Sequence, residues 1–400
     1  MKATKRLGAL ALALVMALSA LSGCGKKDPA SSGSSTSGSP SDGSSSAGGS
    51  SQITPMDLSQ VTDPYLAVSG LAQNEVVAKL GDADITAGHY LYWLQREISE
   101  YLSQFGGQMT TLPWDTEMTE GVTFGQYMLD QALDDAALHA LLRELAGQEG
   151  LTPDPSIASG LDADYVDMVL QAESDEERVI HMFWANLLTK ELYTTLNENS
   201  DLYNQLREKR FGENSGHYPT DAEVNAYLEE TGQYRVKHIL LSTTDENRQP
   251  LEDEAVIAQK KATADDLLSQ LRAAEDPIAL FDDLMRQYSE DPGLEYNPEG
   301  YTTSKGEMVP VFEETSLALK VGEISEVVDS GLGYHIILRL PMDPDDFRTD
   351  CVNYLFQQSL DQERERLGVE KTDAFSKINV GDFWDKVQSL QAAVQAEQAG

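Results

Sequence analysis

The sequence contains few cysteines and few basic residues. Only Cys24 and Cys351 occur among the 400 residues, which excludes a disulfide framework and a metal site built from several cysteines. Lysine and arginine together number 29 against 67 acidic residues, so the formal net charge is −38. This surplus of negative charge excludes nucleic acid as a partner and argues against adhesion to an anionic surface. Solubility and self-repulsion are the simplest explanation of the acidity.

The N-terminal apolar run is too short for an ordinary membrane span. It covers residues 7–21, follows a positive segment at residues 2–6, and ends in the tetrapeptide LSGC at Cys24. The tetrapeptide resembles a bacterial lipobox, in which the cysteine takes a diacylglyceryl group and becomes the new N-terminus. The alternative is an ordinary secretory signal with a chance cysteine. Removal of residues 1–23 takes away three basic residues and no acidic residue, so the net charge of −38 becomes −41.

The rest of the chain divides by composition and periodicity. Residues 24–62 are mostly serine and glycine, which predicts a disordered tether with a root-mean-square reach of roughly 30 Å. Residues 63–233 are predicted to be mainly helical, because apolar residues recur every three to four positions, for example between residues 133 and 145. Single helices are expected over residues 176–196 and 347–367. A strand followed by a turn and a helix start is expected over residues 75–86.

Residues 234–341 have a different pattern, that of an α+β unit. An apolar strand with His238 at its centre is followed by helices near 252–274 and 278–288, and then by a loop rich in Gly, Pro, Asp and Asn. A short helix follows, and two strands end the unit, the last with His335 at its centre. A single histidine within a strand is most often a core residue, but a chain with six histidines has placed two of them in this way.

Four motifs of this region, in order, resemble the parvulin-type peptidyl-prolyl cis-trans isomerases. They are VKHILL, FDDLMRQYSED, KGEMVPVF and GYHIIL. The signal, the helical segment and the C-terminal segment also resemble the PrsA-like foldase lipoproteins, relatives of the SurA-type chaperones. The resemblance implies an α+β fold: a mainly helical chaperone domain, whose N-terminal segment (63–233) is completed by the C-terminal segment (342–400), with an inserted parvulin-like βα3βαβ2 domain (234–341).

The resemblance also implies the site residues. His238 and His335 would lie on neighbouring strands, and Asp291 would be the third polar catalytic residue. Met308 and Phe312 would form the apolar pocket for the substrate proline. Paired histidines can also bind a metal, but Asp291 is the only evident third ligand, so we expect neither a metal nor a cofactor.

Three details of the sequence depart from the family pattern or limit its specificity. Glu299-Gly300 stands where the family often has a pair of glycines, and Leu332 stands where some members have a hydroxyl residue three positions before the second histidine. Lys305 is the only cation near the expected pocket, which argues against specificity for a phosphorylated substrate.

The expected function is that of a foldase held on the extracytoplasmic face of the cell membrane by a lipid on Cys24. It would isomerise Xaa-Pro bonds in unfolded or partly folded secreted clients, as a monomer or a homodimer. The alternative is a holdase chaperone whose isomerase domain is weak or inactive. A solute-binding lipoprotein would need two α/β lobes, which residues 63–230 do not indicate.

The short strands provide the architectural hypothesis. A lone strand is unstable, so residues 76–80 and 376–380 are expected to pair with each other. The 347–367 helix is expected to pack Phe347, Cys351, Tyr354 and Leu355 on the helices of residues 86–200. The C-terminal tail is expected to be a polar helix that frays.

Overall fold

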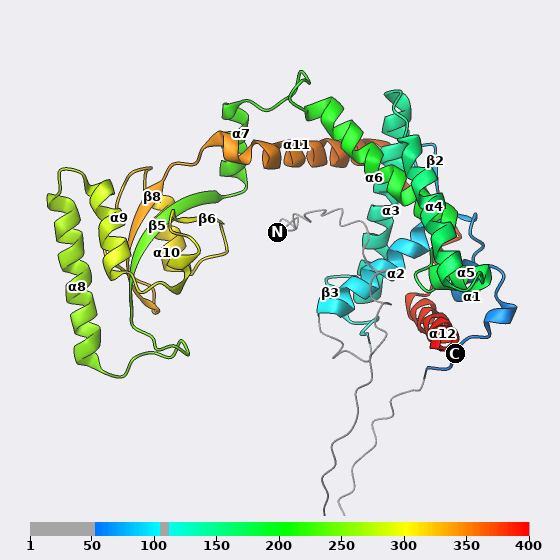
Figure 1. Ribbon diagram of the computed structural model, residues 1–400, viewed down its shortest axis with the longest axis horizontal. Coiled ribbons are helices and arrows are strands. Elements are labelled where there is room, and N and C mark those ends of the chain that lie inside the picture. Colours follow the sequence, from blue (N-terminus) through cyan, green and yellow to red (C-terminus); the bar gives the residue numbers. More distant parts are fainter. Residues whose placement is uncertain (1–52, 105–111, 400) are drawn as a thin grey trace, which may run out of the picture. The chain divides into compact units, whose positions relative to one another are not determined.

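The computed structural model describes residues 53–104 and 112–399, which form two compact units (Figure 1). Unit 1 contains the described residues up to Lys209 and from Gln358 onward, and unit 2 contains residues Arg210–Gln357. The predicted signal peptide, Cys24 and most of the tether lie outside the described residues. Within the described ranges, no helix is both long and apolar enough to span a membrane. The domain boundaries derived from the sequence stay predictions.

Unit 1 is mainly helical. Its elements are η2 (Leu58–Gln60), α1 (Pro64–Ser69), β1 (Val76–Leu80), β2 (Ala83–Thr86), α2 (Ala87–Gln104), β3 (Glu117–Thr119), β4 (Val122–Thr123), α3 (Phe124–Gln148), α4 (Pro155–Gln171), α5 (Glu176–Trp184), most of α6 (Lys190–Phe211), β9 (Val369–Lys371), η4 (Phe375–Lys377) and α12 (Val380–Ala399). The apolar residues that predicted α3 are buried, including Leu133, Leu141 and Leu145.

A three-stranded sheet of order β2-β1-β9 joins the two ends of unit 1. Leu80 pairs with Val369, and Ala78 pairs with Lys371, both in antiparallel register. The predicted completion of the first domain by the C-terminal segment is therefore confirmed. The strand was wrongly placed at residues 376–380, where the chain forms η4 and the start of α12. Phe375, Ile378 and Val380 are buried there, so their apolar pattern belongs to a turn and a helix.

Two other local predictions were also wrong. Residues Ala83–Thr86 form strand β2, which folds back on β1, whereas the sequence had indicated the start of a helix. The helix predicted over residues 176–196 is broken between α5 and α6, where Leu187 has a φ of 47°. Tertiary contacts satisfy the backbone at this break: Tyr65 donates to the carbonyl of Leu187 (2.8 Å) and Gln95 to that of Ala185 (2.8 Å).

Helix α12 is an integral part of unit 1, so the expected fraying was wrong. Its apolar residues are buried at helical spacing, and the helix contacts α1, α3 and α5. They are Val380, Phe383, Trp384, Val387, Leu390, Ala393 and Val394. The polar residues noted in the sequence cover only the outer face of this helix.

Unit 2 contains the α+β region. Its elements are α7 (Asp221–Glu230), β5 (Gln233–Ser242), α8 (Glu254–Ala273), α9 (Pro277–Tyr288), η3 (Pro292–Glu295), β6 (Tyr301–Ser304), α10 (Pro310–Ala318), β7 (Val328–Asp329), β8 (Gly333–Leu340) and most of α11 (Pro344–Leu367). The strands form an antiparallel sheet of order β6-β5-β8-β7. This succession confirms the predicted fold class, with η3 as the third, short helical element.

Each face of this sheet has its own apolar core. Helices α8 and α9 cover one face of the sheet (Figure 1). Ile239 and Leu241 of β5 pack with them there. Val236 of β5 and Ile337 of β8 pack with Phe312 of α10 on the other face. The alternation along β5 that the sequence predicted is therefore confirmed, and His238 is on the α10 face.

Helix α11 begins in a third cluster of unit 2. Buried Cys351, with Phe347 and Leu355, packs against Val224 and Leu228 of α7. The prediction that this face packs on the helices of residues 86–200 was therefore wrong. The prediction that Cys351 is a small buried residue is confirmed, since its exposure is 0%.

Candidate active site

Two histidines lie side by side on the central strands of unit 2. Strands β5 and β8 are antiparallel neighbours in which Leu240 is paired with His335. Residues paired across strands share a face, and so do residues two apart along a strand, which places His238 and His335 on the same face. Their ring centroids are 5.2 Å apart and the rings are nearly perpendicular, at 84°.

Asp291 joins this pair from the segment that follows α9. It caps η3, where its Oδ1 accepts the backbone N–H of Gly293 at 3.1 Å. Its Oδ2 lies 3.1 Å from Nε2 of His238. Nε2 does not meet the geometry of a hydrogen bond, so this contact is a short polar approach that becomes an ion pair when His238 is protonated.

The apolar residues of the predicted proline pocket lie against the same rings. The Phe312 ring centroid is 5.2 Å from the centroid of each histidine ring. Phe312 is only 2% exposed and forms the floor of the cluster, whereas Met308 is half-buried at its rim. The structure thus brings together all five site residues that the sequence indicated in this unit.

Two further residues of the site were missed from the sequence. Tyr301 of β6 stacks on His238 and donates a hydrogen bond to Asp291 Oδ2 at 2.5 Å. Ser330 Oγ and His335 Nε2 are joined by a hydrogen bond of 2.8 Å. A hydroxyl therefore lies beside the second histidine, but it comes from the residue five positions before it. Leu332 occupies the position three before it, where some family members have the hydroxyl. The sequence feature that could have indicated Ser330 is a hydroxyl residue in the turn that precedes the strand of His335.

Comparison with known proteins decides the family. A family model described as the PPIC-type PPIase (rotamase) domain matches residues 238–340. A peptidyl-prolyl cis-trans isomerase Pin1 of Malus domestica is 36% identical over 112 residues, which are 27% of this chain and 93% of that protein. The chain belongs to the PPIC-type peptidyl-prolyl isomerase family. The region that matches the family model, residues 238–340, is called the isomerase domain below.

The chain spans only about a quarter to a half of the length of the longer bacterial relatives that it matches. Foldase protein PrsA of Halalkalibacterium halodurans is 40% identical over 99 residues, 24% of this chain and 28% of that protein. Chaperone SurA of Thiobacillus denitrificans is 26% identical over 274 residues, 66% of this chain and 56% of that protein. The crystal structure of PrsA from Bacillus subtilis aligns with 82% of this chain and 93% of its own, at 18% identity and a TM-score of 0.23. So low a score establishes no common overall arrangement.

The pKa values of His335 and Asp291 in the isomerase domain are both lowered. Burial, together with the neighbouring His238, lowers the pKa of His335 to about 3, so this ring is neutral at physiological pH. Burial by itself would raise the pKa of Asp291, but His238, Tyr301 and the Gly293 amide together lower it to about 2. The site therefore holds a neutral imidazole and a permanent carboxylate, with His238 between them.

A single glycine explains the departure at Glu299-Gly300. Gly300 has a φ of +98°, and a Cβ there would lie 2.5 Å from the carbonyl oxygen of Val236 on β5. The left-handed conformation and the close approach both require glycine at this position, immediately before β6. One glycine is therefore enough to bring Tyr301 beside His238.

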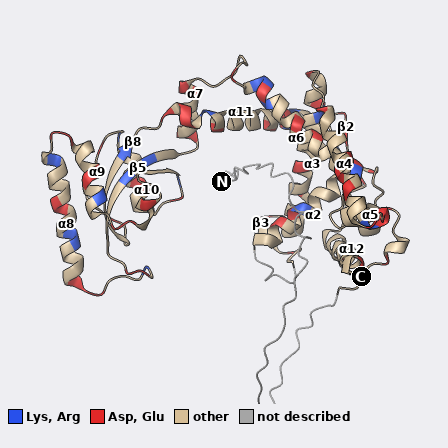
Figure 2. Ribbon diagram, viewed as in Figure 1, with Lys and Arg blue, Asp and Glu red and all other residues tan. Residues whose placement is uncertain are grey.

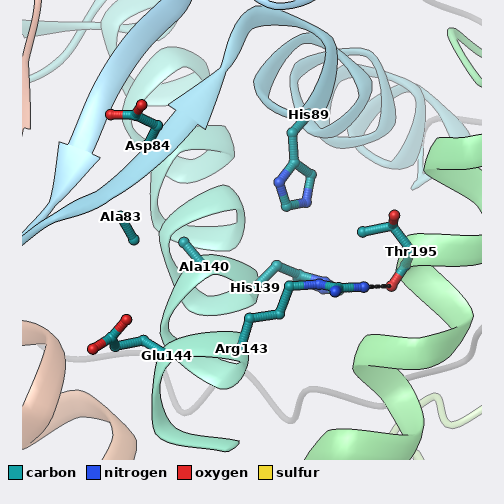
Figure 3. A pocket seen from close by; sticks show the side chains of 8 residues that line it. All are labelled: Ala83, Asp84, His89, His139, Ala140, Arg143, Glu144 and Thr195. Carbon is teal, nitrogen blue, oxygen red and sulfur yellow. Dashed lines mark hydrogen bonds between the residues drawn. The ribbon is translucent and has the colours of Figure 1, made fainter. Parts of the chain in front are cut away.

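A separate cavity of about 260 Å³ lies within unit 1 (Figure 3). It is lined by Ala83, Asp84, His89, His139, Ala140, Arg143, Glu144 and Thr195, and by none of the predicted site residues. Arg143 donates to the carbonyl of Thr195 and to Glu198 at its edge. Among the described residues, no group of His, Cys, Asp and Glu side chains is arranged to hold a metal.

Proposed function

We propose that this chain is an extracytoplasmic foldase, anchored by a lipid on Cys24, that isomerises Xaa-Pro bonds in secreted proteins. The observation that carries the proposal is that His238 of the isomerase domain contacts His335, Asp291 and Phe312. The matched relatives named foldase PrsA and chaperone SurA, and the lipobox-like tetrapeptide at Cys24, support the cellular role.

The chemistry requires no covalent step. Rotation about a peptide bond has a barrier of roughly 18–20 kcal/mol, because the planar amide has partial double-bond character. The twisted amide loses that resonance, and a dry apolar site favours it relative to the more polar planar form. Each tenfold gain in rate requires about 1.36 kcal/mol. An apolar pocket and one or two oriented hydrogen bonds can therefore supply a useful acceleration.

The residues have distinct proposed roles. Met308 and Phe312 hold the proline ring. Neutral His335 and its partner His238 orient the site, and Asp291 presents a fixed negative charge beside the substrate amide. Nδ1 of each ring is buried without a hydrogen-bond partner, so each histidine is oriented through its Nε2, which faces Asp291 in His238 and Ser330 in His335.

A chaperone role is supported by two exposed apolar side chains on α4. Val166 and Leu170 are one helical turn apart on α4, and they are 56% and 63% exposed. Exposed apolar pairs of this kind suit transient contact with unfolded chains. Helix α4 also carries acidic and no basic residues (Figure 2), whereas α8 of the isomerase domain carries both signs. Clients of α4 should therefore be apolar and not acidic.

Exchange NMR on an Xaa-Pro tetrapeptide tests the isomerase function of the full chain. We expect catalysis, and we expect His335→Ala to lower kcat/KM by roughly tenfold, because it removes the neutral ring that contacts both His238 and Phe312. The matched control is His217→Ala, since His217 is exposed in the same unit. Equal rates for the His335 variant and the parent chain would remove His335 from the site.

Aggregation of an unfolded client tests the chaperone role separately. We expect Val166→Ser with Leu170→Ser to weaken suppression of aggregation at least twofold while isomerase activity is unchanged, because these side chains lie outside the isomerase domain. An intact chaperone effect in this variant would show that α4 does not hold clients.

A further inference from the structure

Tyr301 contacts both His238 and Asp291 of the isomerase site. Its ring is stacked on His238, with centroids 5.5 Å apart and an angle of 16° between the planes. Its hydroxyl donates to Oδ2 of Asp291 at 2.5 Å, and the same oxygen lies 3.1 Å from Nε2 of His238. One side chain therefore fixes the plane of the imidazole and one oxygen of the carboxylate.

The other carboxylate oxygen of Asp291 is also held by a hydrogen bond, and the absence of a side chain at Gly293 leaves space for the Tyr301 hydroxyl. Oδ1 of Asp291 accepts the N–H of Gly293 at 3.1 Å. A Cβ on residue 293 would lie 2.2 Å from the Tyr301 hydroxyl oxygen. Hydrogen bonds to a charged acceptor are stronger than neutral ones, so the two donors together hold the carboxylate firmly in one orientation.

The protonation states agree with this geometry. Burial, and then the adjacent Asp291 carboxylate, raise the pKa of Tyr301, so its hydroxyl keeps its proton and remains a donor over the physiological range. Asp291, with its pKa lowered to about 2, remains an acceptor over the same range.

We propose that Tyr301 is a positioning residue of the isomerase site: its hydroxyl holds the Asp291 carboxylate against His238 while its ring holds the imidazole in plane. This inference rests on the proposed role of His238 and Asp291 in the reaction. Without the hydroxyl, the carboxylate can rotate away from His238. Phenylalanine at this position keeps the ring contact and removes only the hydroxyl, so the two contributions can be separated.

The first test compares the full-length Tyr301→Phe variant with a matched control. Tyr296→Phe makes the same chemical change at a side chain that is 80% exposed at the end of η3. Saturation kinetics on an Xaa-Pro tetrapeptide should show a roughly fivefold to tenfold lower kcat for Tyr301→Phe. KM should be unchanged, because the apolar surface of the ring remains. Tyr296→Phe should match the parent chain.

The second test asks whether Tyr301 acts through Asp291. In an Asp291→Ala background, adding Tyr301→Phe should cause no further loss of kcat, because the carboxylate that the hydroxyl holds is absent. Gly293→Ala should reproduce the loss of kcat in the parent chain by displacing the hydroxyl. In the Tyr301→Phe background Gly293→Ala should cause a much smaller loss of kcat, since the nearest remaining ring atom is 3.3 Å from the new Cβ and has to move only slightly.

The outcomes separate this inference from the proposed function. If His238→Ala and Asp291→Ala leave kcat unchanged, the proposed site itself is wrong. If those variants lose activity but Tyr301→Phe behaves like Tyr296→Phe, only the positioning role is overturned. Additive losses from Tyr301→Phe and Asp291→Ala would also overturn it. A variant that unfolds is detected by its thermal midpoint, and Gly293→Ala then supplies the test by a second route.

Discussion

Ending the chain at Leu340 is expected to unfold unit 1 and to leave the isomerase sheet folded. The truncation removes β9, which pairs with β1, and α12, whose seven buried apolar residues belong to the core of unit 1. Each large buried side chain contributes about 1.5–3 kcal/mol. Their joint loss exceeds about 10 kcal/mol, which is comparable to the whole stability of an ordinary domain.

The isomerase sheet should survive because none of its core residues follows Leu340. Its two cores contain residues of β5, β8, α8, α9 and α10, and the cluster of α7 with Cys351 is separate from both. We therefore expect the truncated chain to keep isomerase activity on a tetrapeptide and to lose the helical unfolding transition in circular dichroism.

Point variants on α12 sharpen this test. Phe383 is 1% exposed, and Phe383→Ala should lower the free energy of unfolding of unit 1 by about 3–5 kcal/mol. Asp385 is exposed on the same helix, and Asp385→Ala should change it by less than about 0.5 kcal/mol. An unchanged melting transition in the truncated chain would mean that the C-terminal segment is not part of the unit 1 core.

The sequence was most informative where several signals agreed. Strand alternation placed His238 and His335 at the centres of apolar strands, and the resemblance carried by four ordered motifs implied that these strands are neighbours. Asp291 came from the family resemblance alone, because nothing in its local pattern distinguishes it from other acidic loop residues. The geometry now brings it to His238, and its catalytic role stays a prediction.

Tyr301 and Ser330 could not be found in the same way. Each acts on a residue of another strand, so its importance depends on strand register, which is set by tertiary pairing. Tyr301 looks like an ordinary strand aromatic in the stretch GYTTS. Only the pairing of β6 with β5 places it over His238.

The local errors have a related cause. Strands β2 and β9 are four and three residues long, too short for a period of two to be distinguished from turn or helix patterns. The break at Leu187 is held by side chains from α1 and α2. Such breaks carry little local signal, because the donors that stabilise them are distant in the sequence.

Acid is expected to destabilise unit 1 through two buried histidines. His89 of α2 and His139 of α3 lie beside the unit 1 cavity, with ring centroids 5.5 Å apart (Figure 3). Nε2 of His89 is buried without a hydrogen-bond partner, and Nδ1 of His139 accepts from Asn199 at 2.9 Å. Burial, and then the nearby Arg143, lower the pKa of His89 to about 4. Burial also lowers the pKa of His139 well below its usual value.

These shifts make unit 1 less stable as the pH falls. An unfolded histidine binds a proton with a pKa near 6.5, whereas His89 in the folded unit does so only near 4. Between pH 6.5 and pH 4, the histidine is protonated in the unfolded state and neutral in the folded state. The stability contribution of neutral His89 is therefore complete above pH 6.5 and is lost as the pH falls toward 4. For His89 alone the loss at pH 5 is about 2 kcal/mol.

Buried carboxyl groups in the same pair of helices act in the opposite direction. Burial is the main cause that raises the pKa values of Glu97 on α2 and Asp135 on α3, and their mutual contact raises that of Asp135 further. Their folded forms retain protons that the unfolded chain releases, so they cost stability as the pH rises. The net pH dependence of the parent chain is therefore a poor test of the histidines, and a difference between variants is needed.

We expect His89→Gln to reduce the acid sensitivity of unit 1. The glutamine cannot titrate, so the free energy of unfolding lost between pH 7.5 and pH 5 should be smaller than in the parent chain by about 2 kcal/mol. Urea unfolding followed by circular dichroism at both pH values measures this difference. His217→Gln, at an exposed position in unit 2, is the control for the same substitution made outside unit 1. A ring that is neutral in the folded state takes up a proton when the chain unfolds at pH 5, which favours unfolding. If His89→Gln and the parent chain lose the same stability on acidification, His89 is therefore not held neutral by burial.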